Sequence, residues 1–359
     1  MIDLDAIRKI EDWRKLRFDV GLDVTNLCNL KCKMCYHSLY PKLGIKQEKV
    51  EMGLWLFEKI LRELDGYIES MNLSCSAEPF LHPEFPQFLK ILRKYDVSNT
   101  NIVTNGILMG EKLSEAIVEA KIDMLIISVD AASKEIFKQI RGVSRDKLLD
   151  NIIMLNEIKK KKGSEKPKLR FNMVLMRSNI EDIIALIELA KEYGVEEVNF
   201  QHLVLFKDLN IAYESVFNLN HNYVNKLMDK ALEKAKELGI TVIDMPKFLD
   251  ANYDKRNIIS KLKSLFLPEK DFLCIRPWVS LVFTPKGDVL PCFGWFNEDN
   301  MGNIVRNSFD EIWYSKRYQQ LRKEHRGEAK MREHCRRCSF LASRRYDKYA
   351  FEEKEVNLV

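Results

Sequence analysis

Short apolar runs alternate with amphipathic helical patterns through the first two thirds of this chain of 359 residues. Runs rich in branched and aromatic side chains predict strands at 21–25, 71–76, 101–105, 124–130, 168–176 and 197–204. Apolar residues recur at helical spacing over 53–65, 84–95, 111–120, 146–161, 180–193 and 222–238. Such alternation predicts parallel βαβ units with right-handed crossovers. Six units would make an α/β fold of partial (β/α)6 type, with a sheet curved like about three quarters of a TIM barrel.

Three cysteines follow the first expected strand, in the string CNLKCKMC. In barrels of parallel strands, functional residues gather at the carboxyl ends of the strands. Cys28, Cys32 and Cys35 are too close in the chain to form unstrained internal disulfides. Three thiolates can hold three irons of a [4Fe–4S] cluster and leave the fourth iron open for chemistry. Half of a zinc site is the alternative, but structural zinc normally takes four protein ligands. Cys75, in another strand, is interpreted as a small core residue.

The composition is that of an ordinary globular protein, with 46% hydrophobic and 31% charged residues. The net charge of +5 is too small for this length to indicate a nucleic-acid partner. No uninterrupted apolar stretch reaches about 18 residues, so no membrane span is expected. The charged start has no apolar segment of secretory length. Eight cysteines without an export signal predict metal ligands in a reducing cytoplasm.

A second set of four cysteines lies near the C-terminus: Cys274, Cys292, Cys335 and Cys338. A connector with one helix is expected from about residue 245 to this set. The string VSLVFTPKGDVLPC predicts a hairpin that turns at 285–288. Ser308 and Glu311 form a capping box that would open one basic helix through 308–326. Four thiolates can fully ligate a second [4Fe–4S] cluster or a structural zinc ion, and the spacing alone leaves both possible.

Four further motifs occur in order after the first cysteines. They are Ser76-Ala77-Glu78-Pro79, Thr104-Asn105-Gly106, Ser128-Val129-Asp130 and Arg141-Gly142. With the cysteine spacing, they resemble the radical S-adenosylmethionine (SAM) superfamily over essentially the whole chain after residue 20. Two positions depart from the usual pattern, since Met34 stands where an aromatic residue is commoner and Ala77 where glycine is usual.

This resemblance implies a cofactor and roles for the motif residues. The open iron would bind SAM, and an electron from the cluster would break the sulfonium C–S bond to give a 5′-deoxyadenosyl radical that abstracts hydrogen from a substrate carbon. The Ala77–Glu78 segment is expected to meet the SAM amino group, Ser128 its ribose or carboxylate, and Arg141 its carboxylate. The expected cofactor-binding residues are Met34, Ala77, Glu78, Asn105, Ser128 and Arg141.

The C-terminal set, with twelve residues between Cys274 and Gly287, resembles the auxiliary-cluster extension called SPASM in its shortened, single-cluster form, Twitch. The resemblance implies a second [4Fe–4S] cluster held by all four cysteines. No cysteine occurs in 339–359, so a further auxiliary cluster is not expected. The expected domains are an N-terminal extension over 1–19, a radical SAM core over 20–245, and a connector with a small α+β auxiliary domain over 246–359.

A fully ligated cluster beside the radical site has a physical use, because a substrate radical next to a deprotonated hydroxyl is strongly reducing and can pass an electron to it. The leading hypothesis is therefore a radical SAM oxidoreductase that oxidises or dehydrogenates a sugar, cyclitol or similar polar small molecule. The alternatives are a maturase that oxidises, cross-links or epimerises a ribosomally made peptide or protein, and a non-catalytic iron–sulfur or zinc protein. The first 20 residues would not hold a peptide-leader domain of about 80 residues, although a separate protein could supply one.

The sequence does not identify the catalytic base. The first candidate is His202, after the sixth strand, and the alternatives are Gln201, Tyr213, Glu214 and Arg276. The expected partners are a small-molecule or peptide substrate and a low-potential electron donor such as flavodoxin or ferredoxin, with no nucleic acid and no membrane span. The basic helix residues 313–326 could attract an anionic, phosphorylated or nucleotide-linked sugar.

Overall fold

The computed structural model describes residues 4–44, 46–205, 209–248, 274–295, 299–336 and 338. Most of the predicted connector, over 249–273, lies outside the described residues, and so does the segment after 338. None of the helices in the described ranges is both long and apolar enough to cross a membrane.

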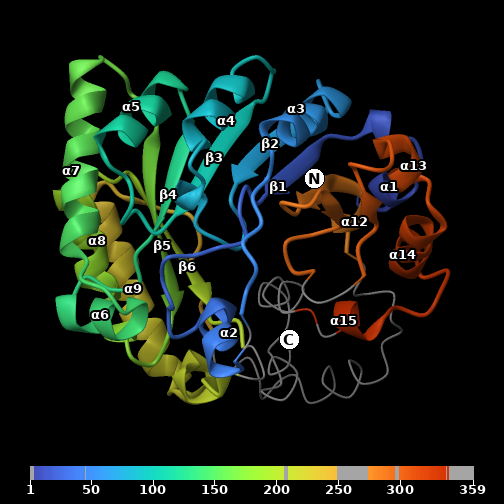
Figure 1. The fold of residues 1–359 in the computed structure, drawn as a ribbon. Coiled ribbons are helices and arrows are strands. Elements are labelled where there is room, and N and C mark those ends of the chain that lie inside the picture. The colour runs from blue at the N-terminus through green and yellow to red at the C-terminus, as the bar shows by residue number, and fades with distance from the viewer. Residues whose placement is uncertain are drawn as a thin grey trace, which may run out of the picture.

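Within these residues, one sheet of ten strands runs in the order β10-β9-β8-β1-β2-β3-β4-β5-β6-β7 (Figure 1). The six predicted strands pair in parallel as β1 (Phe18–Leu22), β2 (Ile68–Leu73), β3 (Asn99–Thr104), β4 (Met124–Ser128), β5 (Lys168–Leu175) and β6 (Glu197–His202). A short seventh strand, β7 (Thr241–Val242), continues the parallel order beside β6. The predicted partial barrel is confirmed.

Helices follow the strands and cover the outer face of the sheet (Figure 1). The main ones are α3 (Leu54–Glu63), α4 (Phe85–Leu92), α5 (Glu111–Glu119), α7 (Asp146–Lys161), α8 (Ile183–Glu192) and α9 (His221–Leu238). Two more were not predicted, α2 (Leu39–Lys42) after the first cysteines and α6 (Lys134–Arg141) after β4. Ser133 caps α6 by accepting a hydrogen bond from the Ile136 amide, and Gly142 ends it in the left-handed conformation.

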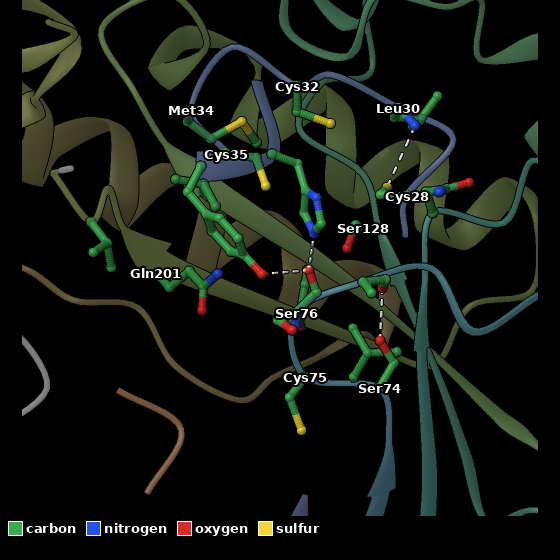
Figure 2. Close-up of a pocket in the computed structure, with 18 of the residues that line it drawn as sticks. Cys28, Leu30, Cys32, Met34, Cys35, Ser74, Cys75, Ser76, Ser128 and Gln201 are labelled. Atoms are coloured by element: carbon green, nitrogen blue, oxygen red, sulfur yellow. Dashed lines mark hydrogen bonds between the residues drawn. The ribbon is translucent and has the colours of Figure 1, made fainter. Parts of the chain in front are cut away.

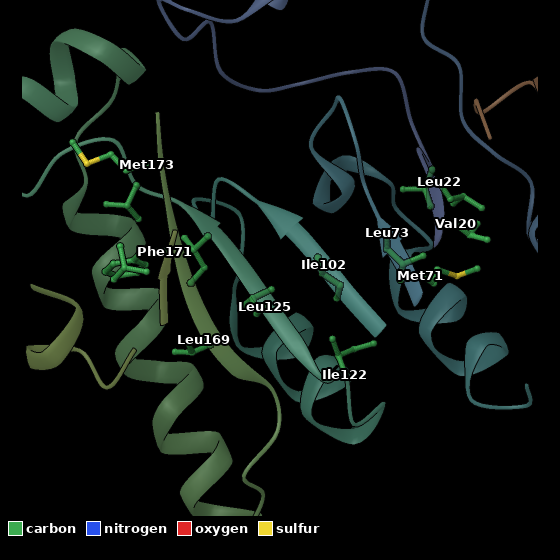
Figure 3. Packing of buried hydrophobic residues seen from close by; sticks show 14 of the residues in the cluster. Val20, Leu22, Met71, Leu73, Ile102, Ile122, Leu125, Leu169, Phe171 and Met173 are labelled. Atoms are coloured by element: carbon green, nitrogen blue, oxygen red, sulfur yellow. The ribbon is translucent and has the colours of Figure 1, made fainter. Parts of the chain in front are cut away.

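The two faces of the parallel strands differ in polarity. Side chains that point toward the helices form the main core, as in β5, where Leu169, Phe171 and Met173 are fully buried (Figure 3). Alternate residues of a strand point to opposite faces. The inner face therefore carries less buried and mostly polar residues, including Asn72, Asn101, Arg170, Asn172 and Asn199. Closed TIM barrels fill this space with branched apolar side chains. Here it remains suited to ligands and water.

Among the described residues, the C-terminal strands extend the barrel sheet and do not form a separate one. The predicted hairpin is β8 (Ser280–Phe283) with β9 (Asp288–Leu290), and β10 (Gly302–Asn303) pairs with β9. β8 also pairs in parallel with β1, at the edge opposite β2. The hairpin prediction is confirmed, and the edge of β1 is covered by backbone hydrogen bonds.

The predicted basic helix over 308–326 is wrong as a single element. The capping box of Ser308 and Glu311 is confirmed, but the helix it opens, α13 (Phe309–Trp313), is short. A second helix, α14 (Lys316–Arg326), begins after Ser315, whose hydroxyl accepts a hydrogen bond from the Tyr318 amide. The chain breaks here because Ser315 offers the backbone a new N-terminal cap. The described part of this region also contains the short helices α12 (Arg276–Val279) and α15 (Glu333–Arg336).

The N-terminal segment packs on these C-terminal helices, with α1 (Leu4–Arg8) beside α14 (Figure 1). Hydrogen bonds from three indole N–H groups hold the N-terminal segment against the C-terminal elements. Trp278 donates to the Ile10 carbonyl oxygen and Trp313 to that of Glu11, at 3.2 and 2.7 Å, while Trp13 donates to Asp310 at 3.0 Å. The predicted extension thus connects β1, which already begins at Phe18, to the auxiliary elements.

Candidate functional site: a cavity between two sets of cysteines

A cavity of about 330 Å³ lies at the carboxyl ends of β2 to β6, where barrel chemistry is expected. Its walls come mainly from the strand ends and from the loop that follows β1, with a smaller contribution from the C-terminal part of the chain. Cys28, Cys32 and Cys35 lie on this loop, and Figure 2 shows them on one side of the space, with Ser76 and Gln201 on the other. All six predicted cofactor-binding residues also line the cavity: Met34, Ala77, Glu78, Asn105, Ser128 and Arg141.

The donor set of the first three cysteines fits a cluster better than a single ion. Structural zinc sites normally have four protein ligands, whereas the loop after β1 offers three thiols. In a [4Fe–4S] cluster each thiolate binds a different iron, so the sulfurs need not meet at one point. Burial raises the pKa of Cys28 to about 12 and that of Cys35 to about 11, so cluster binding must release their protons.

Arg141 ties the cysteine loop to the barrel. Its Nη2 lies 2.5 Å from Asp130 Oδ2, and its Nη1 donates to the sulfur of Cys32 at 3.6 Å. Although burial opposes the charge, Asp130 and Cys32 raise the pKa of Arg141, which therefore stays cationic beside the thiols. Arg141 Nε has no hydrogen-bond partner among the described residues. This leaves one donor for the carboxylate that the family resemblance assigned to this arginine.

A second anchor joins the cysteine loop to the segment after β6. Lys33 forms an ion pair with Glu214, whose other carboxylate oxygen accepts from the Ser178 amide at 3.0 Å. The amide of Lys33 donates to the Ile140 carbonyl oxygen at 2.8 Å. Backbone and side-chain bonds thus hold the loop from two sides.

Glu78 joins the motifs that follow β2 and β3. It is 1% exposed, and its carboxylate accepts from the Thr104 hydroxyl at 2.7 Å and from the Asn105 amide at 2.8 Å. Burial raises the pKa of Glu78 to about 7 in spite of these bonds, so the group is poised to lose its proton when a cation approaches. The side chain of Asn105 donates to Asn29 at 2.9 Å and links both motifs to the cysteine loop.

The turn that precedes Glu78 is held in an unusual shape. Ser74, and not Ala77, has a positive φ, of 121°. Asp23 accepts from the amides of Cys75 and Ser76, at 2.7 and 3.0 Å. His37 Nε2 lies 2.7 Å from the carbonyl oxygen of Ser76 on the other side. These bonds fix a backbone conformation that a serine rarely adopts.

Cys75 is not the core residue that the sequence analysis expected. It lines the cavity, and an added Cβ on Gly21 would lie 2.5 Å from its sulfur. Its place directly after β2, at a strand end, is the signal that could have found it.

The second cysteine set lies on the C-terminal elements. Cys274 precedes α12, Cys292 follows β9, and Cys335 lies in α15. Burial raises the pKa of Cys335, and the charges of Cys292, Cys338 and Cys274 raise it further. Cys338 lines the cavity together with Gly294 and His334. The cavity therefore touches both cysteine sets, which are more than 200 residues apart in the sequence.

The base candidates divide into two groups. Gln201 and His202 line the cavity, whereas Tyr213, Glu214 and Arg276 are not among its described walls. His202 packs against the rings of Phe217 and Phe248, with centroids 4.7 and 5.5 Å away. Burial lowers the pKa of His202 to about 4, so the imidazole is neutral near pH 7.

Asn172 is a wall residue that the sequence analysis missed. It lies on the inner face of β5, opposite Ser128 of β4 in the sheet register. Its Oδ1 is buried and has no hydrogen-bond partner in the described part of the chain. The strict alternation of buried and less buried residues along β5 is the signal that places it inside the barrel.

These features define an iron–sulfur enzyme built on a partial parallel barrel. Residues 22–190 match the radical SAM superfamily, and residues 274–339 match SPASM, an iron–sulfur cluster-binding domain. The chain therefore carries a radical SAM domain and a SPASM domain, as the motifs predicted. The first domain implies SAM and a [4Fe–4S] cluster, and the second implies additional iron–sulfur binding.

Similar proteins cover most of the chain at low identity. A tungsten-containing aldehyde ferredoxin oxidoreductase cofactor-modifying protein of Pyrococcus furiosus is 21% identical over 83% of this chain and 81% of its own length. A GTP 3′,8-cyclase of Chlorobaculum tepidum is 28% identical over 54% of this chain, which spans 55% of that cyclase.

Among solved structures, Streptococcus suis SuiB bound to precursor peptide SuiA has a TM-score of 0.64 at 18% identity. The match covers 86% of this chain and 67% of the SuiB chain. Native anSMEcpe with bound AdoMet has a TM-score of 0.62 at 18% identity, and the match covers 95% of this chain and 93% of the anSMEcpe chain. At these identities the structures show a shared fold.

Proposed function

We propose that this radical SAM enzyme is an oxidoreductase that removes two electrons from an uncharged polar substrate held between its two cysteine sets. The observation that carries the proposal is the single cavity lined by Cys28, Cys32 and Cys35 and also by Cys338. A substrate in this cavity would lie near a radical source and an electron acceptor together. We also propose that the protein works in a reducing cytoplasm and takes its electron from a low-potential donor such as flavodoxin or ferredoxin. The proposed domain boundaries lie at residues 20 and 246.

The residues divide into those that hold cofactors and those that meet the substrate. The first three cysteines would hold the cluster that, with SAM, supplies the 5′-deoxyadenosyl radical, and the other four would hold a cluster that accepts one electron. A secondary alcohol would lose a hydrogen atom from carbon to that radical, a proton from oxygen and one electron, and would leave as a carbonyl compound. Glu78 and Arg141 would bind the amino and carboxylate groups of SAM, with Ser128 at its ribose.

The walls of the cavity favour a neutral substrate. Among the described lining residues, Glu78 is the one carboxyl group and Arg141 the one strongly basic group. Both are already engaged by other side chains, as described above. Asn172 and Gln201 offer amide groups that suit hydroxyl or amide substrates. These walls support a sugar, cyclitol or similar polyol over a phosphorylated or nucleotide-linked one.

A peptide is the second candidate substrate. One similar fold, SuiB, was solved with a precursor peptide, and the amide side chains of the cavity could bind a peptide backbone equally well. In that case the reaction would be an oxidation, cross-link or epimerisation of a residue that enters the cavity.

The experiment that tests the function separates SAM cleavage from substrate oxidation. The reconstituted protein should contain about eight irons for two cubes. Reduced with SAM, it should release 5′-deoxyadenosine. When a panel of deuterated polyols and peptides is added, deuterium from one of these substrate classes should appear in the 5′-deoxyadenosine. The Cys335→Ala variant should still cleave SAM but form no oxidised product, whereas Cys28→Ala should do neither. Loss of cleavage in a folded Cys335→Ala protein would contradict the division of roles.

A further inference from the structure

One glycine on the inner face of the barrel is not required by its backbone conformation. Gly21 lies in β1 between Val20 and Leu22, which belong to the main core. Because successive side chains of a strand alternate, position 21 faces the inside of the barrel. The φ of Gly21 lies outside the left-handed region, so other residues could adopt its conformation. A glycine of this kind in a strand often marks the close approach of another group.

Two side chains occupy the space that a side chain at position 21 would take. A Cβ added to Gly21 would lie 2.3 Å from Cε1 of Phe293 and 2.5 Å from the sulfur of Cys75. Both distances are far below van der Waals contact, so the two side chains pack directly on the glycine. Cys75 follows β2 and lines the cavity (Figure 2), whereas Phe293 comes from the C-terminal elements. The Arg276 guanidinium lies over the phenylalanine ring, 5.8 Å from its centroid.

Phe293 projects from a tight turn that begins at a cysteine of the C-terminal set. We call this segment, residues 292–295, the auxiliary turn. A hydrogen bond from the Trp295 amide to the Cys292 carbonyl oxygen closes it at 3.3 Å. The Trp295 side chain is 3% exposed, and its indole N–H donates to the Asp299 carbonyl oxygen at 3.1 Å. The auxiliary turn is therefore anchored in the C-terminal elements at one end and on β1 through the phenylalanine ring.

The auxiliary turn also contacts the helix that carries another cysteine of this set. His334 of α15 has its Nε2 2.9 Å from the carbonyl oxygen of Gly294. Its ring packs against that of Trp295, with centroids 5.3 Å apart and planes at 63°. Cys335 is the next residue of α15. The position of the auxiliary turn thus bears directly on two of the four C-terminal cysteines.

We propose that Phe293 is a positioning residue that fixes the C-terminal cysteines against the cavity of the first three, and that Gly21 is the seat of its ring. The ring joins the turn that begins at Cys292 to the inner face of β1 and to Cys75, a wall of the cavity. This contact sets the separation of the two cysteine sets, and the separation sets how readily an electron could pass between groups bound there. The inference rests on the contacts of the auxiliary turn with the barrel and not on the oxidation proposed above, so either can fail alone.

The test is the variant Gly21→Ala, whose added methyl group would force the ring of Phe293 from its seat. Hydrogen exchange of the reconstituted protein would be followed by mass spectrometry without oxygen. The peptides to compare cover the auxiliary turn and, as an internal reference, β5. Amides of the auxiliary turn should exchange about tenfold faster than in the natural protein, which corresponds to about 1.4 kcal/mol, because an overpacked contact opens more easily. The amides of β5 should keep their rates.

A second measurement distinguishes positioning from simple packing. Pulsed dipolar EPR of the reduced protein with both clusters gives the distance between them. The distance distribution should shift or broaden in Gly21→Ala. It should return toward that of the natural protein in the double variant Gly21→Ala with Phe293→Leu, because leucine lacks the Cε1 and Cζ atoms nearest to the new methyl group. The control Gly110→Ala, where an added Cβ has nothing within 4 Å, should change neither the exchange nor the distance.

Each outcome bears on the role of the phenylalanine ring. Unchanged exchange and distance in Gly21→Ala would overturn the proposal. A defect that persists in full in the double variant would also overturn it, since the clash would then lie with Cys75 alone. If Gly21→Ala does not fold, Phe293→Ala decides instead. It should speed exchange in the auxiliary turn and broaden the distance distribution, and an unaltered turn and distance would overturn the proposal.

Discussion

Glu78 should make the stability of the apoprotein depend on pH in a direction opposite to that of most carboxylates. Burial raises its pKa to about 7 from an ordinary value of 4.5. The folded state therefore holds the proton more tightly than the unfolded state. The stabilisation is complete below pH 4.5 and is lost as the pH rises to about 7. A gap of about 2.5 units corresponds to about 3 kcal/mol, at about 1.4 kcal/mol per unit.

The variant Glu78→Gln isolates this effect, because glutamine copies the neutral acid and does not titrate. Urea unfolding of both apoproteins, kept reduced, would be followed by circular dichroism at several pH values between 4 and 8.5. The stability of the natural protein should fall relative to that of Glu78→Gln by about 3 kcal/mol across this range. The difference isolates Glu78 from the other titrating groups. A difference that does not vary with pH would refute the reasoning, and it would mean that water reaches the carboxylate or that the surrounding donors outweigh burial.

Two other predictions concern the frame of the site. Gly106→Ala should cost about 2–4 kcal/mol in unfolding free energy, because φ is +73° and the new Cβ would lie 2.2 Å from a leucine side chain of α7. The control is Gly163→Ala, where φ is +61° and an added Cβ has nothing within 4 Å. It should cost only about 1–2 kcal/mol in unfolding free energy. Equal losses in the two variants would show that the contact with the leucine adds nothing. Glu214→Gln removes the partner of Lys33 and should speed iron loss from the first cluster to a chelator, while the auxiliary cluster keeps its rate. Equal rates for both clusters would contradict an anchoring role.

Some features of the site could be predicted from the sequence because they depend on residues that are neighbours in the chain. The spacing of Cys28, Cys32 and Cys35 limits them to a cluster or a metal, whatever the fold. The strand and helix periods place Glu78, Asn105 and Ser128 after successive strands, and parallel strands bring their carboxyl ends to one edge. All of these residues line the cavity.

Contacts between side chains that are far apart in the sequence could not be predicted from it. The motif identified Arg141, but its bonds to Asp130 and Cys32 depend on how α6 sits on the barrel. Cys75 was assigned to the core because the predicted strand ran to residue 76, whereas β2 ends at Leu73 and leaves Cys75 at the cavity. The break at Ser315 was missed because a serine inside a basic helical pattern can either face solvent or cap a new helix.

By itself the sequence determined the partial barrel, the two cysteine sets and the order of the four motifs after the first cysteines, because periodicity and spacing are local properties. The tertiary structure alone decided that β8 pairs with β1 and that Cys338 reaches the cavity of the first three cysteines. These contacts join segments far apart in the chain, and packing across the whole sheet sets their register and direction, which no local pattern records.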